Sequence, residues 1–273
     1  MLSNMRKFGF MLAVFGAALA LAACGGSSDS VKDQASTPPA FVSAADAMGA
    51  SAKQFDTEVH SFDGTMSVNA SAAGQSFAIN GSMKYKEPGQ VYAEMSAEQL
   101  GDFAMLFEPP NMYVKMDGKW YTADTSSLGI DVGGLDQYVK DRGPINYSDA
   151  LKGLTDLVRL NDENIDGKTY WHYNGSIDLS KLGDDLPSDL VDPQMLQQAE
   201  KAVQTAKMDI YVDPETTLPR RYNMTMSMNI LDFPISIGMQ MDFLHYNEDV
   251  DIPDAPTDAQ PLPANSPGAT AFR

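Results

Sequence analysis

The chain has 273 residues and is strongly acidic, with 37 Asp and Glu against 19 Lys and Arg and a formal net charge of -18. A surface of this charge repels phosphate backbones, which excludes nucleic acid as a natural partner. One cysteine excludes an internal disulfide, so a domain of about 200 residues has to be held together by its apolar core.

Residues 1–23 predict a signal peptide. Arg6 and Lys7 precede a short apolar stretch at residues 8–20, which is too short for an ordinary transmembrane span. The run Leu21-Ala22-Ala23-Cys24 that follows resembles the lipobox of bacterial lipoproteins. This resemblance implies cleavage before Cys24 and acylation of that cysteine, and two or three acyl chains form a stable anchor. The alternative, a buried cysteine within an uncleaved helix, conflicts with the glycines and serines at residues 25–28, which end a helix.

The two ends of the mature chain have the composition of unstructured segments. Cleavage removes two cations and no acid, which changes the formal charge from -18 to -20. Residues 24–43 are small, polar and proline-containing and predict a flexible tether. Residues 248–273, rich in Pro, Asp and Ala, predict a disordered acidic tail. Its aspartates lack the glycine turn and terminal glutamate of a calcium loop, so we expect a solvated tail and place the folded domain at residues 44–247.

The first half of this domain predicts a helix and then a series of antiparallel strands. Residues 44–55 have a helical pattern. Apolar and polar residues then alternate, on even positions over 62–70 and on odd positions over 76–85, which is typical of a hairpin with one wet face. Similar alternation marks residues 91–95, 103–107 and 112–116, and Asp117-Gly118 is a strong hairpin turn.

The second half predicts helices between further strands. Residues 135–139 and a segment capped by Ser148, including Leu151 and Leu154, have helical patterns. Strands are expected at 158–165 and 170–179 around an Asp166-Gly167 turn, and a helix at about 193–205. Residues 208–212 and the regular stripes at 222–230 and 235–243 complete the predicted sheet.

Methionine is unusually frequent on the inward positions of these strands, where β-branched residues are ordinarily favoured. Methionine adapts to irregular apolar partners. Two interpretations stay open: a loosely specified core, or a curved sheet whose concave face holds an apolar ligand. Under the second, the predicted lining is Met66, Val68, Phe77, Ile79, Met83, Met95, Met105, Val114, Met224, Met226, Met228, Met239, Met241 and Phe243.

The order of lipobox, tether, helix and hairpins resembles the LppX/LprG-type bacterial lipoproteins and their LolA-like relatives. The likeness covers residues 44–247 and rests on turn-and-strand motifs at Tyr113–Tyr121, Asp166–Tyr173 and Ile210–Arg220. It implies an α+β fold with a strongly curved antiparallel sheet, a half-open barrel, with a few helices covering the concave face. It also implies carriage of lipids or lipidated molecules, and it provides no catalytic set to transfer.

Nothing in the sequence indicates an enzyme, a cofactor or a metal centre. The three histidines are scattered, and no HExxH, GxSxG or CxxC pattern occurs. Arg220 and Arg221 could pair with a lipid phosphate, but in so acidic a chain we expect ion pairs with neighbouring carboxylates. Trp120 and Trp171 could line a cavity rim, although packing in the core is the commoner fate of such rings.

The sequence therefore predicts an extracytoplasmic lipoprotein, anchored to the bacterial cell membrane through Cys24, that binds or transfers a lipid or another acylated molecule without catalysis. The alternative is a cell-envelope interaction or sensory module with a filled core and no ligand. Both functions are compatible with a protein partner in the cell envelope.

Overall fold

The computed structural model describes residues 43–72, 74–98, 101–109, 111–123, 151–183, 201–230 and 233–261. The helices bounded within these ranges are α2 (Ala44–Glu58) and the short α5 (Leu179–Gly183). The strands are β1 (Ser61–Ala72), β2 (Gln75–Lys86), β3 (Gln90–Ala97), β4 (Gly101–Glu108), β5 (Asn111–Met116), β6 (Lys119–Ala123), β7 (Leu154–Arg159), β8 (Glu163–Ile165), β9 (Lys168–Ile177), β10 (Val203–Val212), β11 (Pro219–Ile230), β12 (Phe233–Tyr246) and β13 (Gln260–Pro261). No helix in this part of the chain is long and apolar enough to cross a membrane.

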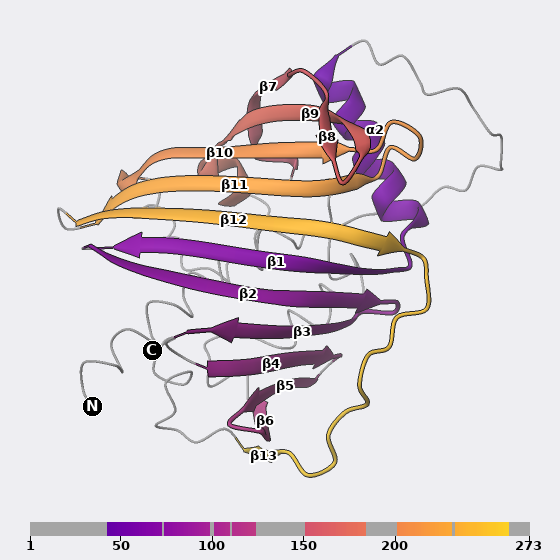
Figure 1. The fold of residues 1–273 in the computed structure, drawn as a ribbon, viewed down its shortest axis with the longest axis vertical. Helices are drawn as coiled ribbons and strands as arrows, with labels where there is room; N and C mark the ends of the chain where they lie inside the picture. The colour runs from indigo at the N-terminus through magenta and orange to yellow at the C-terminus, as the bar shows by residue number, and fades with distance from the viewer. Residues whose placement is uncertain are drawn as a thin grey trace.

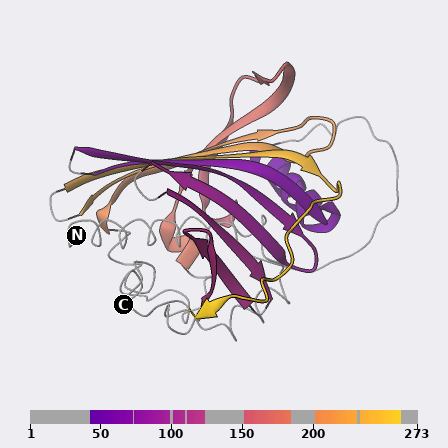
Figure 2. The same cartoon turned by 60° about the horizontal axis from the view of Figure 1, so that its bottom comes forward.

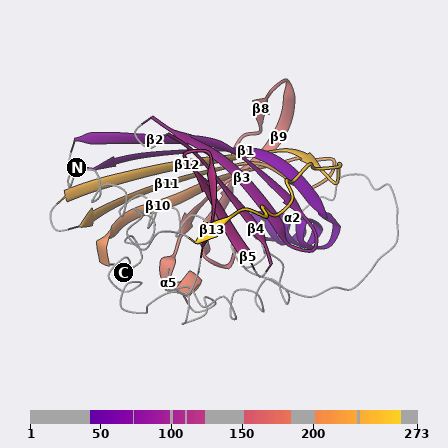
Figure 3. The same cartoon turned by 90° about the horizontal axis from the view of Figure 1, so that it is seen from below.

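The strands form one large sheet, in the order β13-β6-β5-β4-β3-β2-β1-β12-β11-β10-β9-β7, with β8 paired to β9 (Figure 1). All the pairs are antiparallel except β13 with β6. The sheet is strongly curved, as Figures 2 and 3 show, and β13 and β7 are its two ends. The predicted curved antiparallel sheet is confirmed.

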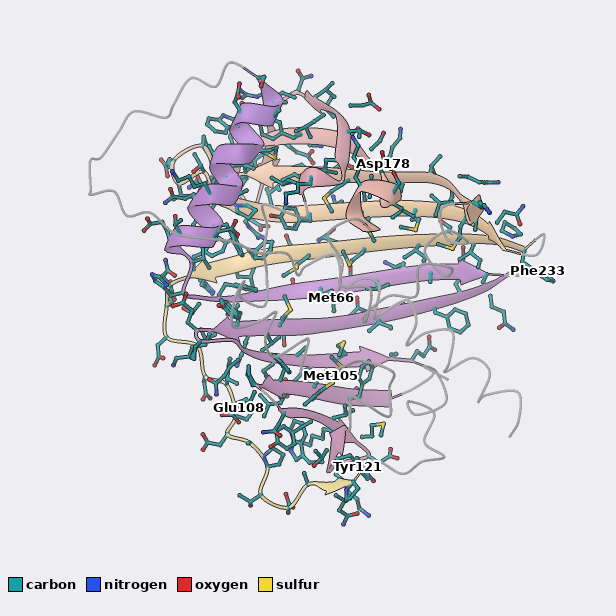
Figure 4. The ribbon with its side chains drawn as sticks, turned by 180° about the vertical axis from the view of Figure 1, so that it is seen from behind. Met66, Met105, Glu108, Tyr121, Asp178 and Phe233 are labelled. Carbon is teal, nitrogen blue, oxygen red and sulfur yellow. The ribbon has the colours of Figure 1, made fainter. Side chains whose placement is uncertain are left out.

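Helix α2 packs on one face of this sheet, which we call the inner face. The helix begins where Ser43 caps it, with the Ser43 hydroxyl accepting a 3.1 Å hydrogen bond from the Asp46 amide. Its buried Phe55 lies 6.1 Å from the Phe62 ring and 5.9 Å from the Phe243 ring, centroid to centroid. Because α2 lies over one end of the strands, it leaves the other end free of this helix (Figure 4).

Alternation along the strands assigns the other side chains to a face. The two central strands pair in register, with Met66 opposite Met241 and Val68 opposite Met239. On the far side of β1, Val68 lies opposite Ile79 of β2. Residues opposite one another in an antiparallel pair point to the same face, so the predicted inward positions of β1, β2 and β12 share the inner face.

The predicted tail does not begin at residue 248. Residues 248–261 are part of the described structure, and we call them the C-terminal strap. Val250 is buried, Ile252 packs against Tyr92 and Leu106 on the outer face, and the strap ends as β13. Lys84 Nζ also donates a 2.9 Å hydrogen bond to the Asp251 carbonyl. Composition suggested disorder, but isolated apolar residues in the strap cover an apolar patch that the sheet leaves on its outer side.

Three element predictions in the second half are wrong in part. Leu154 begins β7 and is not helical. The single strand expected at 158–165 is two strands, because Arg159 pairs with Tyr173 while Glu163 pairs with Tyr170, and the residues between break the ladder. β9 ends at Ile177, and Leu179 belongs to α5.

The helix predicted at about 193–205 does not extend to its expected end. β10 begins at Val203, which pairs with Met228 of β11, so strand pairing overrides the helical pattern there. Residues 193–200, the predicted helix at 135–139 and the start of the segment capped by Ser148 lie outside the described residues. Covering of the inner face by helices is therefore observed for α2, and the broader prediction stays a prediction.

Candidate apolar ligand-binding face

A methionine-rich cluster occupies the inner face beyond α2, and we call it the methionine cluster. Among the described residues, every member comes from a strand. It contains eight of the predicted lining residues, namely Met66, Val68, Ile79, Met95, Met105, Met226, Met228 and Met239. Ala70, Ala72, Ala93, Ala97, Phe103, Ile235 and Ile237 complete it. Figure 4 shows Met66 and Met105, from β1 and β4, on this side of the sheet.

The members of the methionine cluster differ in exposure. Val68, Met95 and Ile237 are 5%, 3% and 7% exposed, whereas Met226 and Met239 are only half-buried. A face of half-buried methionines can bind a flexible apolar chain, because the unbranched thioether adjusts to the shape of its neighbour. The nearly complete burial of the aliphatic members is also compatible with a filled core.

The remaining predicted lining residues lie elsewhere. Met83, Met241 and Phe243 belong to the cluster under α2, where they pack with Phe55 and Phe62. These three therefore support the helix and do not share the methionine cluster. Of the others, Met224 is buried at 4% exposure, and Phe77 and Val114 are half-buried.

A pocket of about 510 Å³ lies near the ends of the strands that point away from α2. We call this end of the sheet the tip. The pocket is lined by Asn69, Ala70, Ser71, Ser76, Phe77, Ala78, Ala97, Glu98, Ser236 and Gly238. Phe77 is the one predicted lining residue that borders it, and Ala70 and Ala97 are the members of the methionine cluster that it includes.

The outer face carries an ionic network beside the same strands. The Asp242 carboxylate accepts hydrogen bonds from Arg220 Nη1 at 2.8 Å, Arg221 Nε at 2.6 Å and Gln240 Nε2 at 2.6 Å. Arg220 also pairs with Asp166 at 2.8 Å. The prediction that the two arginines pair with carboxylates is confirmed, and these cations stabilise the fold around a buried Asp242.

The aromatic and histidine side chains take structural positions. The His172 ring stacks on Tyr211 at 4.4 Å, and its Nε2 lies 2.9 Å from Asp209 Oδ1. Trp120 packs with Leu106 on the outer face, away from the inner cluster. In the described part of the chain no group of three or more His, Cys, Asp or Glu side chains is arranged to hold a metal ion. Cys24 lies outside that part.

Comparison with solved structures returns the types of protein that the sequence motifs indicated. Lipoprotein LppX from Mycobacterium tuberculosis is 15% identical over 76% of this chain and 94% of its own, with a TM-score of 0.42. LprF from Mycobacterium bovis is 15% identical, with 77% and 96% covered and a TM-score of 0.44. A LolA superfamily protein from Nitrosomonas europaea is 13% identical, with 77% and 96% covered and a TM-score of 0.30.

No family model matches the chain, and no curated protein matches it. At these identities and TM-scores the likeness to the solved structures concerns the fold, and no argument about ligand or partner rests on it. The resemblance to LppX-type and LolA-like proteins is accordingly a resemblance in architecture.

Proposed function

We propose that the mature chain begins at Cys24, is anchored by a lipid on that cysteine to the outer side of a bacterial cell membrane, and binds or transfers a lipid or another acylated molecule. The observation that supports this most directly is the methionine cluster, an apolar surface built from strands and lying beyond α2. Residues 24–43 would serve as the tether. No step in this function requires catalysis.

Burial of apolar surface would supply the binding free energy. Each methylene of an acyl chain that leaves water contributes about 0.8 kcal/mol, before the cost of ordering the chain and the protein. The half-buried methionines would move to admit the ligand, and helices over the concave face would cover it. The fourteen predicted lining residues remain the candidate lining, with the eight in the methionine cluster as its centre.

A second candidate function is favoured by one observation. Val68, Ile79, Met95, Ile235 and Ile237 are each no more than 7% exposed, because other parts of the chain cover them. A face already covered to this extent would suit an envelope interaction or sensory module that recognises its partner through other surfaces.

Mass spectrometry of organic extracts from the mature protein, produced in a bacterial host, separates the two candidates. A stoichiometric lipid beyond the one attached to Cys24 supports the carrier. Absence of bound lipid, together with no uptake of a fluorescent fatty acid or phospholipid, supports the filled core.

A paired substitution tests the lining. Met226→Asp with Met239→Asp places two charges in the methionine cluster and should abolish ligand retention. Thr225→Asp with Asn229→Asp is the matched control, because these two exposed residues lie on the outer face of β11 and do not line the pocket. If the first variant folds, as judged by its circular dichroism and thermal unfolding, and still retains ligand, the assignment of the lining is wrong.

A further inference from the structure

The tip of the sheet has no charged residues in its four central strands. Residues 66–72 of β1, 75–82 of β2, 222–230 of β11 and 233–241 of β12 include no Asp, Glu, Lys, Arg or His, although 21% of the chain is charged. These strands are neighbours, in the order β2-β1-β12-β11. Their charge-free parts therefore form one continuous surface, which we call the neutral block. Asp232, which lies between β11 and β12 in the sequence, is the charged residue that separates its two C-terminal stretches.

The neutral block ends at a line of charges that crosses the sheet. Arg221 lies opposite Asp242, and Asp63 lies opposite Lys84. Beyond this line, toward α2, the turns are rich in acids, including Glu87, Asp166, Asp213, Glu215 and Glu248. Among the described residues, the acids of these turns therefore lie away from the tip, whereas Glu98 and Asp102 follow and begin the strands beside it.

Apolar groups are exposed at the end of the neutral block. Phe233, at the start of β12, is 57% exposed, and the next residue, Pro234, is exposed too. Figure 4 shows Phe233 at the end of the sheet opposite α2. The pocket at the tip adds Phe77 and Ala78, and Glu98 is its one charged lining residue.

We propose that the tip, with Phe233 at its end, is the part of the protein that contacts the lipid bilayer, and that apolar ligand passes there between the membrane and the methionine cluster. A bacterial membrane surface is anionic, so an acidic protein approaches it at lowest electrostatic cost through a neutral surface. An aromatic side chain on that surface enters the headgroup region.

Two further features fit this orientation. The inner side of the neutral block carries Met66, Met226 and Met239 of the methionine cluster, so these four strands present no charged side chain to a ligand moving along them toward the tip. The nineteen residues from Gly25 to Ser43 can span more than about 60 Å when extended, so an anchor on Cys24 would leave the tip free to reach the bilayer.

Contact with the bilayer can be measured on the acylated mature protein in vesicles of three parts phosphatidylcholine to one part phosphatidylglycerol. Cys24 is the one native cysteine and its thiol is acylated, so Phe233→Cys provides a single thiol for a fluorophore. Glu215→Cys, on an exposed turn at the α2 end, is the matched control. Phospholipids carrying a nitroxide should quench the label at 233 and leave the label at 215 unquenched.

Equal quenching at the two positions would overturn the proposal. Quenching at position 233 that increases with the density of protein on the vesicles, and does not depend on the content of nitroxide lipid, would also overturn it. That result would mean that the tip binds a second copy of the chain.

The inference that ligand passes through the tip rests on the proposed function and is tested by a separate experiment. Phe233→Asp should slow the exchange of a fluorescent phospholipid between vesicles by at least about tenfold, without changing the amount bound at equilibrium. Leu160→Asp makes the same kind of change at an exposed apolar residue near the α2 end and should leave exchange unaffected. A wild-type protein that binds no phospholipid would refute the carrier function, while the quenching result would still decide whether the tip contacts the membrane.

Discussion

Arg221 of β11 lies directly opposite Asp242 of β12, and its Nε donates a 2.6 Å hydrogen bond to the Asp242 carboxylate. The Asp242 side chain is 9% exposed and that of Arg221 is 24% exposed. Arg220 Nη1 donates a 2.8 Å hydrogen bond to the same oxygen, Oδ1, so one buried carboxylate pairs with two guanidinium groups. This cluster joins the two strands at the point where the neutral block ends.

Replacing Asp242 should therefore be costly. Asp242→Ala leaves two partly buried guanidinium groups without their shared carboxylate, and we expect the free energy of unfolding to fall by about 2–4 kcal/mol. Urea unfolding of the two proteins measures the change.

Asp162→Ala is the control, because Asp162 pairs with Arg159 in an exposed salt bridge. Its loss should cost less than about 1 kcal/mol. Equal effects of the two substitutions would contradict the structural role assigned to Asp242.

Tyr211 should make the free energy of unfolding decrease at alkaline pH. Burial, together with the nearby Glu163 and Asp209 carboxylates, raises the pKa of Tyr211 to about 12. A tyrosine in the unfolded chain has a pKa of about 10, so the unfolded state loses its proton first. The stabilising contribution is complete below pH 10 and is lost as the pH rises through about 12.

The free energy of unfolding, measured from pH 8 to pH 12, should thus decline less steeply in Tyr211→Phe than in the wild type. Some decline will persist in the variant, because burial also raises the pKa of Tyr85 and of Tyr92. Identical pH profiles would show that Tyr211 does not contribute.

The C-terminal strap should stabilise the outer side of β3 and β4. Ile252→Ser removes the side chain that packs on Tyr92 and Leu106, and we expect a loss of about 1–3 kcal/mol in the free energy of unfolding. Amide hydrogen exchange of residues 250–261 should also become faster.

Asp254→Ser, at an exposed position of the same strap, is the matched control and should leave both measurements near their wild-type values. Rapid exchange of the strap's amide hydrogens in the wild type would contradict the packing described for Ile252.

Gly64 should tolerate no larger residue. A Cβ there would collide with the backbone carbonyl oxygen of Asp242 on the neighbouring strand, and backbone atoms of a sheet cannot move aside cheaply. We expect Gly64→Ala to lower the free energy of unfolding by about 1–3 kcal/mol, as overpacking typically does.

Gly49 differs from Gly64, because the structure has room for an added Cβ at this position. A Cβ at Gly49 meets nothing within 4 Å, and the residue lies inside α2. Gly49→Ala should raise stability by up to about 1 kcal/mol. Thermal unfolding of the two variants measures both, and a destabilised Gly49→Ala would contradict the position of α2.

The strands were predictable where one face is buried and the other is wet. The parity of β1, β2, β11 and β12 follows directly from the sequence, because a period of two fixes which side chains share a face. The helical pattern of residues 44–55 likewise predicted α2. Where pairing partners decide the structure, as at Val203 and Leu154, local helical patterns misled the prediction.

The candidate site was likewise predictable in part from the sequence. The sequence determined that methionines line the inward face, but it could not separate the methionine cluster from Met83, Met241 and Phe243, because α2 covers the second group only in three dimensions. The outer network around Asp242 was predictable only as a pairing of arginines with some acid. Its actual members depend on a strand register that brings together residues 21 and 22 positions apart.

What the sequence by itself determined is the local order of the chain: its acidity, the alternation of the strands and the absence of charges from residues 64–82 and from most of 222–241. Only the tertiary structure decided that those two uncharged segments lie side by side as one surface, and that the strap packs on the outer face. Pairing of distant strands and burial of isolated apolar residues such as Ile252 depend on contacts across the sheet, which local sequence patterns do not encode.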